Sequence, residues 1–305
     1  MAIETAEIEE QTVVREDEPT VAADAPELDV PVTVIQPTRG LSFVDLHALW
    51  HYRELLFFLV WRDVKVRYKQ TVLGVIWVIL QPLASMLIFT ILFGVLLNAP
   101  SGGVPYPVFA FAGLLPWNYF ASALTRSSTS VVNSANLVTK IYFPRLVIPL
   151  SAVFSGLVDF AVSSVVFAVI MLLYGIAPTP AILLLPLFLL LAMMTALGFG
   201  LWLSALNVRY RDINYLVPFL VQIWMYLTPV VYATTLIPER YRFLLSLNPM
   251  TGVVEGFRRA LLGPGVTDTV LAPGLVAVSV GIALAVFLSG LVFFRTTERT
   301  FADIV

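Results

Sequence analysis

The sequence predicts an all-α membrane protein. We expect six transmembrane helices, an N-terminal amphipathic interfacial helix, and short amphipathic helices between the fifth and sixth spans. The 305 residues are 59% hydrophobic and only 12% charged, about half the charged share of a soluble globular chain. Only seven charged residues lie between Thr71 and Tyr232. The apolar runs that they separate approach or exceed the roughly 20 residues needed to cross a bilayer.

The first 40 residues differ from the rest of the chain. They hold ten acidic and two basic residues, which leaves 16 basic and 10 acidic residues in the remainder. This segment has neither the positive start nor the apolar stretch of a signal peptide. Its composition is typical of a disordered acidic cytoplasmic tail, and an interaction segment is the alternative.

Residues 41–70 predict an amphipathic helix that lies in the membrane plane. Phe57, Trp61 and Tyr68 recur at helical spacing on one side, and basic residues occupy another side. Such a basic face suits the anionic inner leaflet. A simple membrane anchor and an elbow that also touches a partner protein both fit this pattern. The interfacial residues are Trp61, Arg62, Lys65, Arg67 and Lys69.

Residues 71–305 predict the six-helix transmembrane domain. The spans lie at about 72–97, 106–124, 146–174, 181–206, 215–233 and 274–294, with Pro116, Pro218 and Pro229 interrupting the second and fifth. Basic residues precede the first span and lie between spans two and three and between spans four and five. The loops 98–105 and 175–180 carry no charge. The positive-inside rule therefore places both termini in the cytoplasm.

Segment 234–263 is too polar to span and predicts two short amphipathic helices on the outer side, separated at Asn248–Pro249. Glu255 and Arg259 have the i,i+4 spacing of an ion pair. The charged residues of interest in this segment are Glu239, Arg240, Glu255, Arg258 and Arg259.

Several motifs of enzymes are absent from the sequence. There is no cysteine, no G-x-x-x-x-G-K-[ST] phosphate loop, no H-E-x-x-H and no G-x-S-x-G. The sequence therefore predicts no catalytic residue, no metal site and no nucleotide site on this chain.

Asp159 is the one ionisable residue near the middle of a predicted span. A bare carboxylate there costs a few kcal/mol, so it needs a partner or a wet cavity. It is either a substrate-pathway or proton-relay residue, or a helix–helix hydrogen-bond partner of Asn118, Gln81 or Gln222.

Aromatic residues are dense near the predicted helix ends and proline breaks. They form an interfacial belt or line a conduit for sugars, whose apolar faces stack on flat rings. Together with Asp159, the conduit candidates are Trp77, Trp117, Tyr119, Phe120, Trp224 and Tyr226.

Several strings, in order along residues 45–305, resemble the ABC-2 type permeases that export bacterial polysaccharides. They are WRDVKVRYKQTVLG from Trp61 with Trp77 and Gln81-Pro82, FAGLLPW from Phe111, KIYFPR from Lys140 with Pro149, VRYRD from Val208, QIW from Gln222, PVVY from Pro229, and Asn248-Pro249. The acidic tail is longer than expected for such permeases.

The resemblance implies a homodimer in the inner membrane of a bacterium that pairs with two copies of a separate ABC ATPase. The ATPase would bind ATP and Mg. This chain would bind no cofactor and no nucleic acid. The resemblance also implies a lipid-linked polysaccharide substrate of the O-antigen, capsule, teichoic acid or galactan class. Segment 234–263 would form gate helices, and the loop before the third span would contact the ATPase. The contact residues would be Arg126, Lys140, Tyr142 and Arg145. A membrane-embedded glycan-processing enzyme and a proton-coupled carrier that uses Asp159 are the rival classes.

Overall fold

The computed structural model describes residues 46–69, 74–177, 179–263 and 273–301. These residues all belong to one compact unit, which runs from Phe43 to Val305. They are mostly helical, and none of them forms a β-strand. The all-α prediction is therefore confirmed, whereas the predicted tail at residues 1–40 lies outside the described residues.

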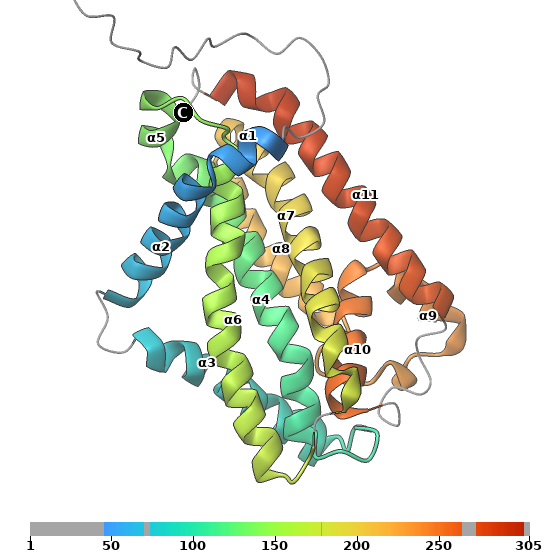
Figure 1. Cartoon of the computed structure of the whole chain (residues 1–305). Helices are drawn as coiled ribbons and strands as arrows, with labels where there is room; N and C mark the ends of the chain where they lie inside the picture. Colours follow the sequence, from blue (N-terminus) through green and yellow to red (C-terminus); the bar gives the residue numbers. More distant parts are fainter. Residues whose placement is uncertain (1–45, 70–73, 178, 264–272, 302–305) are drawn as a thin grey trace, which may run out of the picture. The chain divides into compact units, whose positions relative to one another are not determined.

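The interfacial segment forms α1 (Leu46–His51) and α2 (Arg53–Lys69). Helix α2 runs alongside α6 (Val147–Leu173) and contacts it (Figure 1). Leu59 is buried in the core, whereas Phe57 and Trp61 on the predicted apolar side are exposed. A helix therefore forms in the expected region. Phe57 and Trp61 of the predicted apolar stripe face outward, whereas Tyr68 of the same stripe is half-buried. The position of this helix in the membrane plane stays a prediction.

Five of the six predicted spans are confirmed as helices long and apolar enough to cross a membrane. They are α3 (Gly74–Phe89) continued by the π-helix η1 (Thr90–Leu96), α4 (Tyr106–Asn133), α6, η2 (Pro180–Leu184) continued by α7 (Leu185–Arg209), and α11 (Pro273–Thr297).

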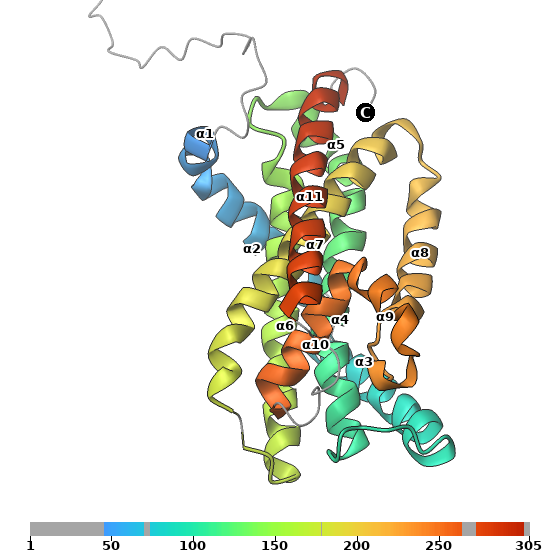
Figure 2. The same cartoon turned by 90° about the vertical axis from the view of Figure 1, so that its right-hand side faces the viewer.

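The fifth predicted span is shorter than expected. Helix α8 (Ile213–Leu227) has 15 residues, which gives a length of roughly 22 Å. It continues through Pro218 and ends before Pro229, because proline lacks the N–H that would extend the helix. The described residues therefore confirm five bilayer-length helices, with α8 as a shorter apolar helix at one edge of the helix group (Figure 2).

Helix α4 is the central element, in contact with α3, α6, α7, α8 and α10 (Pro249–Leu262). It passes through Pro116 and ends nine residues later than the sequence predicted. The polar stretch after residue 124 stays helical, and several of its hydroxyl groups bond to carbonyls of the preceding turn. Thr125 donates to the Ala121 carbonyl at 2.8 Å, and Ser128 donates to the Thr125 carbonyl at 2.7 Å.

Helices α7 and α11 lie side by side (Figure 2). A Cβ atom on Gly290 would collide with the backbone carbonyl of Gly198, so only glycine allows this approach. Small residues commonly bring membrane helices together in this way.

Segment 234–263 holds η3 (Thr234–Leu236), α9 (Glu239–Ser246) and α10. Helix α9 is largely exposed, as the sequence predicted. Helix α10 is amphipathic as predicted, but its expected position at the surface is wrong, because all of its residues except Arg259 and Leu262 are buried. Its neighbours α4, α7 and α11 surround it.

Candidate functional site

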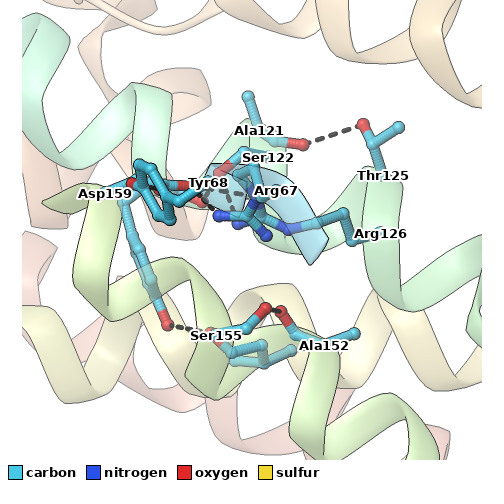
Figure 3. A network of polar contacts seen from close by, with 11 residues as sticks. Arg67, Tyr68, Ala121, Ser122, Thr125, Arg126, Ala152, Ser155 and Asp159 are labelled. Carbon is cyan, nitrogen blue, oxygen red and sulfur yellow. Dashed lines mark hydrogen bonds and ion pairs between the residues drawn. The ribbon is translucent and has the colours of Figure 1, made fainter. Parts of the chain in front are cut away.

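Asp159, on α6, joins α2 and α4 through one carboxylate (Figure 3). Its Oδ2 accepts hydrogen bonds from the guanidinium groups of Arg67 and Arg126, the second at 3.1 Å. Its Oδ1 accepts a hydrogen bond from the Tyr68 hydroxyl at 2.5 Å. Arg126 also donates to the Ser122 hydroxyl at 3.1 Å. Three helices therefore meet at this cluster.

The charged side chains of this cluster are largely withdrawn from solvent. The exposed fractions are 25% for Arg67, 28% for Arg126 and 20% for Asp159. Burial, reinforced by the hydrogen bond to Asp159, raises the pKa of Tyr68 to about 12. Its hydroxyl therefore remains a donor at physiological pH. Because buried charges persist when they are paired and hydrogen-bonded, the cluster stabilises the joint between α2, α4 and α6.

Asp159 does form helix–helix hydrogen bonds, but the expected partners Asn118, Gln81 and Gln222 are wrong. Sequence reasoning assigned Arg67 to the membrane interface and Arg126 to a cytoplasmic loop. The structure instead places Arg126 inside α4, seven residues before its end, and brings Arg67 to Asp159 from 92 residues away. The signal available in the sequence was a lone buried carboxylate in a chain rich in arginine. A role for Asp159 in the substrate path stays a prediction.

The remaining interfacial residues lie elsewhere on α2. Arg62 pairs with the adjacent Asp63 at 2.9 Å. Trp61, Lys65 and Lys69 are exposed. They are available to lipid headgroups or to a partner protein, and Arg67 alone of the predicted set joins the Asp159 cluster.

The expected ATPase-contact loop contains α5 (Ala135–Lys140) and leads into α6. Lys140, Ile141 and Tyr142 are exposed, with Tyr142 at 71%. Arg145 instead donates a hydrogen bond to the backbone carbonyl of Glu298. The loop therefore offers an accessible surface at its tip, and Arg145 is engaged within the chain.

The predicted conduit aromatics fall into two groups. Trp117, Tyr119 and Phe120 are buried in the core. The Trp224 ring lies edge-on between Phe120 and Phe199, with centroid distances of 5.0 and 4.9 Å. By contrast, Trp77 and Tyr226 are exposed at 57% and 59%. The latter two are free to form either a membrane belt or a conduit wall.

A second ionic cluster lies where α4 and α10 meet the turn after α8. Arg258 is fully buried, pairs with Glu255 at 3.1 Å and lies 3.8 Å from the centre of the Phe109 ring. Its guanidinium also donates to the carbonyls of Pro229, Val230 and Tyr232 in the turn after α8. The Tyr106 hydroxyl donates to the remaining carbonyl of this turn, that of Val231.

The expected pairing of Glu255 with Arg259 is wrong. Glu255 uses the i,i+3 partner Arg258, while Arg259 is the exposed residue of α10. Burial raises the pKa of the Glu255 carboxyl, and Arg258 opposes this rise. Glu239, 89% exposed, contacts Arg242 at 3.5 Å, and the Arg240 guanidinium lies 4.6 Å from the Tyr241 ring. Segment 234–263 therefore combines an exposed α9 with an α10 that is held by buried contacts.

Among the residues that the structure describes, no group of three or more His, Cys, Asp or Glu side chains could hold a metal ion. The chemistry of the two ionic clusters is that of paired charges and hydrogen-bonded carbonyls. Both clusters serve to join helices.

Comparison with known proteins matches residues 54–262 to the family described as ABC-2 type transporter. An O-antigen export permease of Myxococcus xanthus is 33% identical over 77% of this chain and 90% of its own length. A permease of the same description from Klebsiella pneumoniae is 30% identical over 87% of this chain and all of its own length. A polysialic acid transport protein of Escherichia coli is 26% identical over 78% of this chain and 91% of its own length.

Proposed function

This chain belongs to the ABC-2 type transporter family, and we propose that it is the membrane permease subunit of a bacterial exporter of a lipid-linked polysaccharide. The observation that carries the proposal is the match to O-antigen export permeases across nearly their whole length. The substrate belongs to the O-antigen class, and teichoic acid and galactan chains are the alternative substrates.

The energy for export comes from a separate ABC ATPase, which binds ATP and Mg. The sequence supports this division because it contains no phosphate loop. The end of the molecule that carries α5 and the end of α11 (Figure 1) is its cytoplasmic end. This orientation follows from the basic residues near that end and presents Lys140 and Tyr142 to the ATPase.

Export requires two copies of the chain. The described helices enclose a core that is filled by side chains of α4, including Phe111, Trp117 and Phe120. A passage wide enough for a hydrated glycan therefore has to form between protomers. Closed two-fold symmetry is the commonest arrangement of such a pair.

Deletion of the gene in its native bacterium tests the proposal. We expect surface polysaccharide to disappear, polymer to accumulate inside the cell, and expression of the wild-type chain to reverse both effects. The same reversal is expected to require an intact Walker A lysine in the partner ATPase. Export that continues without ATP hydrolysis and stops in an Asp159→Asn variant would favour a proton-coupled carrier. Synthesis defects without internal polymer would favour a glycan-processing enzyme.

A further inference from the structure

The loop between α5 and α6 is hydrogen-bonded to the C-terminal segment that follows α11. Arg145 lies on the first turn leading into α6, where the Ile148 N–H donates to its carbonyl at 3.1 Å. Its guanidinium donates to the backbone carbonyl of Glu298 in η5 (Glu298–Thr300), which directly follows α11. The same carbonyl also accepts the Phe301 N–H, so Arg145 is its second donor. Arg145 therefore ties the segment after α11 to a loop about 150 residues earlier in the chain.

The segment Glu298–Phe301, to which Arg145 bonds, is itself held in place by further contacts. Arg295 pairs with the Glu298 carboxylate at 3.0 Å, and neither side chain is more than about a third exposed. Phe301 is fully buried, with its ring edge-on to Phe294 at 5.3 Å. The described C-terminal residues thus give the Arg145 guanidinium a fixed acceptor.

We infer that Glu298–Phe301 is a brace for the ATPase-docking loop and that Arg145 is the positioning residue that links loop and brace. This inference rests on the proposed function. It divides the loop into an exposed docking surface, Lys140–Tyr142, and an internal anchor at Arg145. The sequence had grouped these residues as equivalent ATPase contacts.

With the brace in place, a movement of the loop can be transmitted to the membrane helices in two ways. One route is covalent, through Pro144 into α6. The other runs from Arg145 to Glu298 and so to α11, which contacts α7 through the close approach of Gly290 to Gly198. With both routes intact, α6, α7 and α11 respond together to ATP binding on the partner.

The test uses the full complex of permease and ATPase. Each variant is scored by the host's own polysaccharide at the surface of a gene-deletion strain and by MgATP hydrolysis of the purified complex. Because hydrogen bonds from charged donors shift equilibria strongly, we expect Arg145→Gln to lower export per ATP about tenfold. Arg145→Lys should recover part of this loss. Arg211→Gln removes the same charge from an exposed arginine between α7 and α8, outside the brace and the loop, and should leave the ratio within about twofold of wild type.

Truncation after Thr297 separates a brace from a direct ATPase contact, because it removes the acceptor and keeps Arg145. The brace requires the truncation to reproduce the loss, and the two changes combined to cost no more than either alone. If truncation does not yield membrane-inserted protein, Arg295→Gln replaces it, with a smaller loss in the same direction.

A normal export-to-ATP ratio for Arg145→Gln overturns the inference, as does an additive loss when Arg145→Gln is combined with the truncation. Failure of the wild-type chain to restore surface polysaccharide counts instead against the proposed function. The two failures are therefore distinguishable.

Discussion

Replacing Arg258 by methionine tests the buried cluster that joins α10 to the turn after α8. The change keeps a long apolar side chain beside Phe109 and removes the guanidinium. It leaves the Glu255 carboxylate buried without its ion-pair partner and frees the carbonyls of Pro229 and Val230. We expect the free energy of unfolding to fall substantially.

The magnitude follows from these contacts. Breaking a buried ion pair by removing one partner costs about 3–5 kcal/mol. A buried carbonyl left without a donor costs a further ~1–3 kcal/mol. Arg258→Met should therefore cost at least about 4 kcal/mol. Combining it with Glu255→Met removes the unpaired charge and should recover about 2 kcal/mol or more of that cost.

Unfolding of the purified protein in denaturing detergent, followed by tryptophan fluorescence, measures these differences. Two buried or partly buried tryptophans, Trp117 and Trp224, report on the α4–α8 region. Arg259→Met is the matched control, because Arg259 is the next residue on the same helix and is exposed. Surface changes of this kind usually stay within about 0.5 kcal/mol.

Equal stabilities of Arg258→Met and Arg259→Met would refute the reasoning. A larger loss for Arg259→Met would mean that Glu255 uses the i,i+4 partner that the sequence pattern favours. A double variant that is less stable than Arg258→Met alone would show that Glu255 contributes through contacts other than its charge.

Three further changes probe the other joints. Asp159→Asn removes the anionic acceptor of Arg67 and Arg126, so limited proteolysis within α2 should accelerate, whereas Asp63→Asn on the same helix should leave the rate unchanged. Gly290→Ala should cost about 1–3 kcal/mol of unfolding free energy through overpacking against Gly198. Gly281→Ala, with open space around its Cβ position, should be neutral or stabilising in the same assay. Trp224→Phe keeps the ring contacts but loses the N–H bond to Asn248 and should cost about 1 kcal/mol.

Hydropathy alone located most of the helices. The third span was expected at residues 146–174 and the helix is Val147–Leu173, because the apolar run begins after Arg145 and the helix ends just before Gly175, whose φ is +67°. This reasoning failed at α4, whose last turns are rich in Ser and Thr. A hydroxyl that bonds to its own helix is satisfied without water, and hydropathy does not record that bond.

The sequence indicated which charged residues form the candidate sites, but not which of them pair with one another. Helical spacing offers a glutamate both an i+3 and an i+4 partner. Tertiary packing decided between Arg258 and Arg259, because the turn after α8 presents its carbonyls to one side of α10. The contacts of Asp159 with Arg67 and of Arg145 with Glu298 join residues far apart in sequence. No local pattern indicates such contacts.

The polar joints are unevenly distributed among the helices, and this constrains which helices can move. Helix α4 contributes Arg126 to the Asp159 cluster and Tyr106 and Phe109 to the Arg258 cluster. Displacing α4 would therefore break the Arg126–Asp159 ion pair near one end. Near the other end it would break the Tyr106 hydrogen bond to Val231 and the contact of Phe109 with Arg258. The middle of α8 faces α4 and α7 through apolar side chains, and its polar attachments lie at its ends, through Asn214 and Trp224. Sliding apolar surfaces past one another costs less than separating buried charges. A passage that opens during export should therefore involve movement of the middle of α8, while α4 and the turn after α8 stay in place.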